Sequence, residues 1–139
     1  MKVYVDTSIV LRRMLGQAGA IQRWVEWDLA VTSELMRVEA LRTLDRLRIS
    51  GRLSDVELAD LAALLRTLAL SLEEIPIQSP VLQRASSPFP TSVATLDAIH
   101  LATALLWMED NGDKLTFLTH DRQLSIAARA CGMETKISR

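Results

Sequence analysis

Short apolar runs alternate with longer segments of helical periodicity along the whole chain. Runs rich in β-branched residues predict strands at 2–5, 29–32, 72–77, 114–119 and 134–137. Apolar residues spaced three and four apart predict helices at 9–15, 21–27, 33–49, 54–70, 81–85, 97–108 and 122–130. Helices that separate strands are typical of a mostly parallel sheet covered on both faces. We therefore expect one α/β domain over residues 1–139.

Several predicted elements end in capping or turn residues. Ser54, with Glu57 three positions later, has the pattern of a capping box at a helix start. Gly51 and Gly132 follow predicted helices, where glycine commonly ends the helix. Residues 86–93 are rich in proline and serine and predict a loop. Local signals therefore support the alternation of elements.

Composition permits a single core but gives no global nucleic-acid signature. Hydrophobic residues make up 49% of the 139 residues, and the net charge is −1. A balance this close to neutral excludes binding driven by overall positive charge, so any nucleic-acid contact must be local. Arginine supplies 13 of the 16 basic residues, which suits bidentate phosphate contacts but also fits a GC-rich coding sequence.

The single cysteine bears on the cellular compartment. Cys131 has no partner for an internal disulfide, and its apolar neighbours predict a buried thiol in a reducing environment. The first residues lead directly into a predicted strand, and no uncharged apolar stretch reaches about 18 residues. We therefore expect no signal peptide, no membrane span and a cytoplasmic location.

Four acidic residues lie where a predicted strand gives way to a helix or just inside a helix: Asp6, Glu39, Asp97 and Asp121. The carboxyl ends of parallel strands share one edge of a sheet, so these side chains can converge there. Other roles stay open for each of them. The three aspartates are favoured near helix starts as caps, and Glu39 could pair with Arg42 on the helix surface.

Asp97 fits a structural role least well. Residues 98–108 are apolar except for His100 and Thr103, which predicts a helix buried nearly all round. A carboxylate facing inward there must be hydrogen-bonded, paired or bound to a metal. His100 lies three residues on, on the same face, where it could steady a metal-binding carboxylate, contact substrate or be a hydrogen-bonded core histidine.

Converging carboxylates need a multivalent cation to offset their repulsion. We expect Asp6, Glu39 and Asp97 to lie close enough to share one ion. Oxygen-only ligands select a hard ion, Mg²⁺ or Mn²⁺, whereas zinc would call for His or Cys at ligand spacing. The chemistry that follows is phosphodiester hydrolysis by activated water. Thr7 and Thr119 flank the acids and could orient water or phosphate, as could Ser8, for which a turn or capping role is the stronger alternative.

Four segments together resemble the PIN domain, and most closely the VapC-type toxins of bacterial toxin–antitoxin pairs. The segments are VDTSIVL, SELMRVEALR, TLDAIHLATALL and TFLTHDRQLSIAARACG, in that order. The resemblance implies a single-domain, Rossmann-like three-layer fold with a sheet of four to five strands. It also implies a Mg²⁺- or Mn²⁺-dependent endoribonuclease that forms a homodimer and is neutralised by a cognate antitoxin. By the same resemblance, Asp6, Glu39 and Asp97 match the metal-binding acids, and Asp121 matches a more variable fourth acidic position.

Other classes of protein fit less well, with one exception. A phosphoacceptor receiver domain needs a late lysine, but Lys114 precedes its strand, and a haloacid-type phosphatase needs an acid at position 8, which is Ser8. A catalytically idle interaction module with the same fold remains as the alternative. Trp24 and Trp27 could form a dimer or antitoxin surface, stack on bases or lie in the core. Five arginines could line a phosphate track or a solvated helix face: Arg37, Arg42, Arg46, Arg48 and Arg52.

Overall fold

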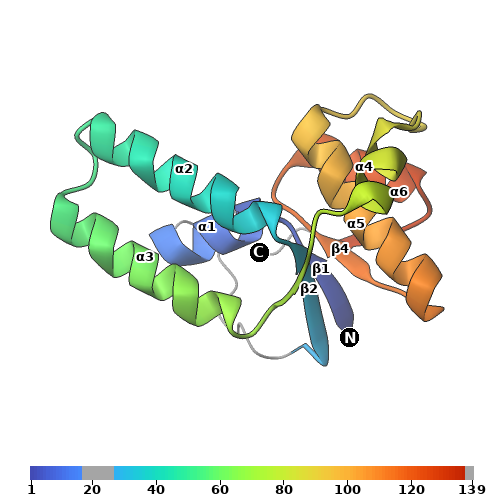
Figure 1. The fold of residues 1–139 in the computed structure, drawn as a ribbon, viewed down its shortest axis with the longest axis horizontal. Coiled ribbons are helices and arrows are strands. Elements are labelled where there is room, and N and C mark those ends of the chain that lie inside the picture. Colours follow the sequence, from blue (N-terminus) through green and yellow to red (C-terminus); the bar gives the residue numbers. More distant parts are fainter. Residues whose placement is uncertain (17–26, 137–139) are drawn as a thin grey trace.

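A computed structural model describes residues 1–16 and 27–136. Within them, a parallel sheet of five strands has the order β3-β2-β1-β4-β5 (Figure 1). The strands are β1 (Lys2–Val5), β2 (Leu29–Ser33), β3 (Glu73–Ile75), β4 (Thr116–Leu118) and β5 (Glu134–Lys136). Each lies in a segment predicted as a strand, except that β2 extends by one residue to Ser33, which was predicted to start the next helix. The α/β fold with a parallel sheet is therefore confirmed.

Six helices connect or follow the strands in the described chain. They are α1 (Thr7–Leu15), α2 (Leu35–Ile49), α3 (Asp55–Ala69), α4 (Ser79–Ser86), α5 (Thr95–Asn111) and α6 (Arg122–Ala130). The predicted capping box forms at α3, where the Ser54 hydroxyl accepts from the Glu57 N–H and the Glu57 carboxylate accepts from the Ser54 N–H.

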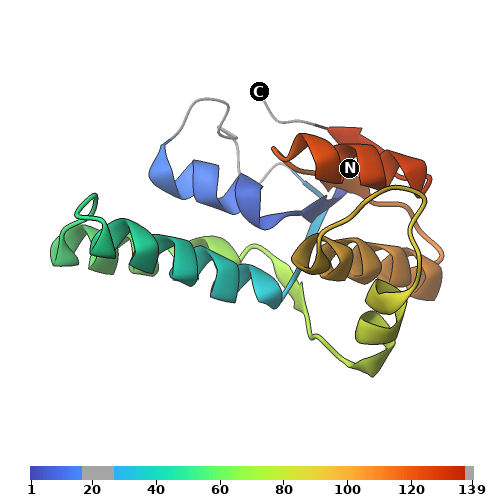
Figure 2. The ribbon, with the colours of Figure 1, turned by 90° about the horizontal axis from the view of Figure 1, so that it is seen from above.

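Alternation along the strands creates two cores, one on each face of the sheet. Val3 and Val5 point to the face covered by α1, α2 and α3, where Met36 and Leu44 are fully buried. Tyr4 points to the opposite face, covered by α5 and α6. Figure 1 shows these helix groups on either side of the strands, and Figure 2 shows the same layers from above. The predicted three-layer arrangement is therefore present.

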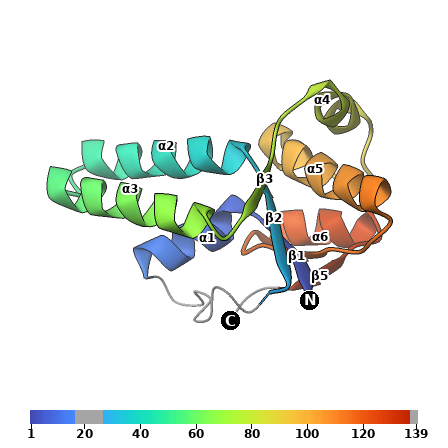
Figure 3. The same cartoon turned by 60° about the horizontal axis from the view of Figure 1, so that its bottom comes forward.

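Helices α2 and α3 pack side by side and extend away from the sheet together (Figure 3). Apolar residues along α2 bury one face against the core, including Met36, Ala40 and Leu44. Glu39 is half-buried beside that face, as the helical pattern predicted. The N-terminal part of α2 therefore brings Glu39 to the edge of the sheet.

Strand β1 lies between β2 and β4 and is the point where the chain reverses its direction of progress across the sheet. The register aligns Tyr4 with Val31 on one side and with Phe117 on the other. From β1 the chain adds β2 and β3 on one side, then crosses over to β4 and β5 on the other. Ligands of open α/β sheets bind outside the carboxyl ends of the strands at such a reversal.

Some predictions were wrong in detail. Helix α5 begins at Thr95 rather than Asp97 and runs to Asn111, where Gly112 ends it with a φ of 60°.

Cys131 is only partly buried, and burial raises the pKa of its thiol. Trp27 lies in a bend, and the rest of the helix predicted at 21–27, including Trp24, lies outside the described residues. Within the described chain, no helix has the length and apolarity needed to cross a bilayer.

Candidate active site

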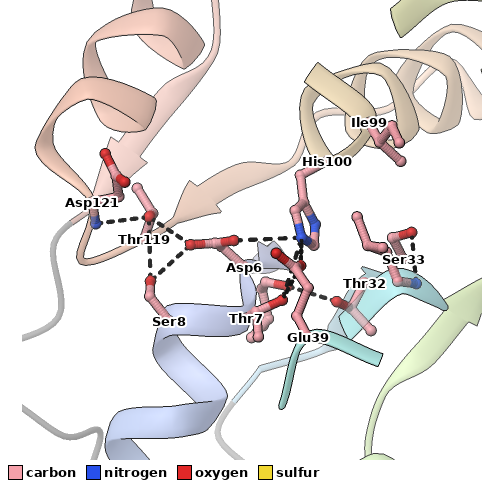
Figure 4. Close-up of polar contacts among 12 residues, drawn as sticks. Asp6, Thr7, Ser8, Thr32, Ser33, Glu39, Ile99, His100, Thr119 and Asp121 are labelled. Carbon is pink, nitrogen blue, oxygen red and sulfur yellow. Dashed lines mark hydrogen bonds and ion pairs between the residues drawn. The ribbon is translucent and has the colours of Figure 1, made fainter. Parts of the chain in front are cut away.

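Asp6 lies at the carboxyl end of β1, immediately before α1. It occupies the N-cap position of α1, yet its carboxylate accepts no capping hydrogen bond from that helix. Instead, the Ser8 and Thr119 hydroxyls both donate to Asp6 Oδ2, at 2.7 and 2.8 Å (Figure 4). The capping role considered for Asp6 is therefore absent, and two hydroxyls from opposite ends of the chain hold its carboxylate in place.

Glu39 is held by a different pair of side chains. The Thr7 hydroxyl donates to Glu39 Oε1 at 2.8 Å, and His100 Nε2 lies 2.5 Å from the same oxygen (Figure 4). The surface ion pair with Arg42 is not what engages Glu39, because Arg42 bonds to Asp45. Burial by itself would raise the pKa of Glu39, but the hydrogen bond and charge of His100 outweigh it and lower that pKa.

His100 has no exposed surface and is hydrogen-bonded at both ring nitrogens. Its Nδ1 lies 2.6 Å from the Tyr4 hydroxyl, and its Nε2 faces Glu39 and stands 3.7 Å from Asp6 Oδ1. Burial by itself would lower the pKa of His100, but the hydrogen bond to Glu39 and the neighbouring carboxylates raise it. His100 is thus a hydrogen-bonded core histidine that steadies a groove carboxylate.

Tyr4 is a member of this network that the sequence analysis missed. It is fully buried in β1, stacks on Phe117 with ring centroids 5.0 Å apart, and meets the His100 ring edge-on. Burial raises the pKa of Tyr4 well above its usual value, and the charge of Asp6 raises it further. A buried tyrosine usually needs a hydrogen-bond partner, so a tyrosine among the valines of β1 was a signal that could have been used.

Asp97 differs from Asp6 and Glu39 in lacking a hydrogen-bonding support. It is half-buried in the first turn of α5, where the N-cap is Ala94, and within the described chain its carboxylate accepts no hydrogen bond. Burial, then the charges of Asp6 and Asp121, raise the pKa of Asp97 to about 6. Repulsion from other acids is the signature expected of carboxylates gathered at one place.

Asp121 is the most exposed of the four acids. It caps α6, since its Oδ1 accepts from the Leu124 N–H at 2.9 Å. The capping role considered for this residue is therefore present. Its charge nevertheless reaches Asp97, so Asp121 belongs to the same electrostatic neighbourhood.

The four acids line one groove at the carboxyl edge of the sheet. The groove has a volume of about 400 Å³ and is also lined by Arg42, Arg46 and the apolar residues Val38 and Leu96. Within residues 1–16 and 27–136, however, no three His, Cys, Asp or Glu side chains stand close enough to ligate one ion. The expectation that Asp6, Glu39 and Asp97 share one ion position is therefore wrong for this arrangement, in which like charges repel and separate partners hold Asp6 and Glu39.

The polar residues expected to position substrate lie behind the acids. Thr7 is 4% exposed, and Thr119 and His100 are each 0% exposed. Their hydrogen bonds run to Glu39 or Asp6 and orient these carboxylates, and Thr7 in addition lines the groove. Ser8 shares this task, and it also accepts from the His120 N–H at 2.9 Å.

The arginines of the expected phosphate track have three different settings. Arg42 and Arg46 line the groove, and Arg42 is also paired with Asp45 at 3.0 Å. Arg37 is paired with Glu74 at 2.6 Å, and Arg48 with Asp45 at 2.9 Å. Arg52 is exposed beyond the end of α2. The groove therefore combines four acids with two arginines, and most of the remaining positive charge of α2 is engaged elsewhere.

Comparison with known proteins gives a consistent result. The PIN domain family matches residues 3–130. Two relatives come from Mycobacterium tuberculosis: Ribonuclease VapC47 of strain CDC 1551 / Oshkosh is 29% identical over 96% of this chain and 94% of its own length. Ribonuclease VapC46 of strain ATCC 25618 / H37Rv is 30% identical over 94% of this chain and 93% of its own length.

Solved structures share the fold at lower identity. A toxin–antitoxin complex from Klebsiella pneumoniae contains a chain that superimposes with a TM-score of 0.66 and 16% identity, covering 99% of this chain and 98% of its own. The protein PAE2754 from Pyrobaculum aerophilum gives a TM-score of 0.65 and 19% identity, covering 97% and 83% of the two chains. With a family match that spans both cores and the acidic groove, and with VapC-type relatives along nearly its whole length, this chain belongs to the PIN domain family.

Proposed function

We propose that this protein is a Mg²⁺- or Mn²⁺-dependent endoribonuclease and the toxin of a toxin–antitoxin pair. The observation that carries the proposal is the groove in which Asp6, Glu39, Asp97 and Asp121 lie together at the reversal point of the sheet. The relatives named as VapC ribonucleases support the choice of RNA as the substrate.

The donor set of the groove fits a hard divalent cation. All four acids present oxygen, the ligand type that Mg²⁺ and Mn²⁺ prefer. Burial, then the charges of Asp6 and Asp121, raise the pKa of Asp97, and a cation would offset the repulsion among these acids. Asp6, Glu39, Asp97 and Asp121 would hold the ion, which requires the carboxylates to move closer together than they stand here. A cation bound there activates water and stabilises the negative charge that develops on the phosphate.

The chain's own residues then contribute orientation and substrate binding. Hydroxyl and imidazole groups behind Asp6 and Glu39 limit the directions in which these carboxylates can turn, as outer partners of metal ligands commonly do. Arg42 and Arg46 reach the groove from α2 and bind backbone phosphates beside the acids. Hydrolysis adds the elements of water across a P–O bond, leaving a phosphate on one RNA fragment and a hydroxyl on the other.

The toxin assignment implies partners. An antitoxin segment that bears arginine or lysine would pair with the groove carboxylates and block the cation. Exposed apolar side chains line the same groove, with Val38 58% and Leu96 47% exposed, and offer the apolar part of such an interface. A contribution of Trp27 to this interface is less direct, because its side chain is partly buried against the core that contains Val3 and Val5. We further propose a homodimer located in the cytoplasm.

Cleavage of a mixed RNA pool tests the proposal. The purified protein should cut RNA with Mg²⁺ or Mn²⁺ and not with EDTA, and mapping of the cut ends identifies the preferred sequence. Asp6→Asn should abolish cleavage, whereas Asp60→Asn, a change at an exposed aspartate of α3, should not. A wild-type protein that neither cleaves RNA nor is stabilised by millimolar metal would instead be an interaction module with the same fold.

A further inference from the structure

A buried chain of contacts connects the core of the sheet to one of the groove acids. It runs from the Tyr4 hydroxyl to His100 Nδ1 at 2.6 Å, and from His100 Nε2 to Glu39 Oε1 at 2.5 Å. Tyr4 belongs to the central strand β1, His100 to α5 and Glu39 to α2, so this series of contacts joins three elements. Tyr4 and His100 are both 0% exposed and therefore cannot touch a substrate in the groove.

Tyr4 and Glu39 hold opposite nitrogens of the His100 ring, and the Glu39 carboxylate, which can only accept, keeps a proton on Nε2. A neutral imidazole has one N–H and one lone pair, and the hydrogen bond at one nitrogen selects the role of the other. When the Tyr4 O–H donates to Nδ1, the proton of the ring stays on Nε2 and points at the Glu39 carboxylate. The opposite tautomer would turn a lone pair toward that carboxylate and push it away.

We propose that Tyr4 is a positioning residue that acts through His100 to hold the Glu39 side chain at the groove, where its carboxylate can bind the divalent cation. This inference rests on the proposed function only in taking Glu39 as a cation ligand. The Thr7 hydroxyl, from α1, donates to the same carboxylate oxygen at 2.8 Å. Glu39 Oε1 is therefore held from two sides, by Thr7 and by His100, which in turn contacts Tyr4. Outer partners of this kind typically change metal affinity or activity about 10- to 100-fold when they are removed.

Tyr4→Phe removes the hydroxyl and keeps the ring that stacks on Phe117. We expect it to weaken Mn²⁺ binding, measured by titration calorimetry, by about tenfold or more. The kcat for RNA cleavage should fall while the KM for RNA stays the same, because the change does not reach the groove surface. An unchanged Mn²⁺ affinity in folded Tyr4→Phe would overturn the proposal.

Two further variants separate positioning from a general loss of packing. Thr103→Val is the matched control, because Thr103 is 1% exposed in the same helix as His100 and its hydroxyl donates to the Ile99 carbonyl instead. It should leave Mn²⁺ affinity and kcat within about twofold. In a Glu39→Gln background, Tyr4→Phe should cost no additional Mn²⁺ affinity, since the two changes act on one pathway. Equal losses with and without the Glu39 carboxylate would contradict the proposal.

The wild-type protein provides a test that does not depend on the folding of any variant. At alkaline pH, ¹⁵N NMR of the His100 ring should show the proton on Nε2, and a proton on Nδ1 would overturn the inference. A wild type that binds Mn²⁺ but cleaves no RNA would refute the proposed function, and the affinity comparison would still decide the role of Tyr4. A wild type that binds no Mn²⁺ would refute both.

Discussion

Replacing Asp97 by asparagine should stabilise the metal-free protein at pH 8. Burial and the charges of Asp6 and Asp121 raise the pKa of Asp97 to about 6, so the ionised form is disfavoured in the folded state. The unfolded chain has no such penalty. Asparagine has nearly the same shape and no charge, and within the described residues no hydrogen bond to the Asp97 carboxylate is lost.

The size of the effect follows from the difference in pKa between the two states. A rise of about two pKa units corresponds to roughly 3 kcal/mol, at 1.36 kcal/mol per unit. Solvent reaches this half-buried carboxyl and screens part of the repulsion, so we expect about 1–2 kcal/mol. In a domain of this size the melting temperature should rise by roughly 3–8 °C.

The gain should depend on pH in a defined direction. Because the pKa of Asp97 is raised on folding, its contribution to stability is fully present below about pH 4 and is lost as the pH rises through about 6. The advantage of Asp97→Asn should therefore shrink to about a third at pH 4.5, where the folded carboxyl is mostly protonated. Thermal denaturation in EDTA at both pH values measures this, with Asp60→Asn as the control at an exposed position.

Two results would refute the reasoning. A lower melting temperature for Asp97→Asn at pH 8 would show that the carboxylate has a structural partner. A gain of equal size at both pH values would show that its charge is not the cause. Millimolar Mg²⁺ should reverse the order of the two proteins, because only the wild type keeps all four acids of the groove.

Three other perturbations have defined outcomes. Mg²⁺ at 100 times its dissociation constant should add about 2.7 kcal/mol to the stability of the wild type in chemical denaturation, and much less to Asp6→Asn, which loses a ligand. Ser54→Ala should cost about 1 kcal/mol by removing the capping box of α3 while RNA cleavage is retained, and a cost below 0.3 kcal/mol would contradict the capping geometry. Arg42→Gln and Arg46→Gln should each raise the KM for RNA. Each should also make the RNA affinity less steeply dependent on salt concentration, as the loss of about one phosphate contact does, and unchanged salt slopes would exclude these residues from RNA binding.

The fold was readable from the sequence because its elements are locally encoded. The valines of β1 and the capping box of α3 act within a few residues, and the structure reproduces both. Boundaries were less certain. The helix predicted at 97–108 continues to Asn111, because Gly112 is the residue that adopts the left-handed conformation and ends it.

The sequence predicted which acids lie together in the groove, but it did not predict which side chains hydrogen-bond to each of them. Parallel strands predict that Asp6, Glu39 and Asp97 meet at one edge, and all three line the groove. Which hydroxyl serves which carboxylate depends on packing between elements far apart in the chain, as in the bond from Thr119 to Asp6. The same holds for His100, whose two partners come from β1 and α2.

The central place of β1 has a consequence for synthesis on the ribosome. β1 is made before the other four strands of the sheet, yet β4, one of its two neighbours, is completed 113 residues after Val5, about 6–23 s later at typical elongation rates. Until then Asp6 lacks Thr119, and Asp121 has not been made. A nascent chain therefore carries an incomplete acidic groove until β4 and the residues up to Asp121 have been made.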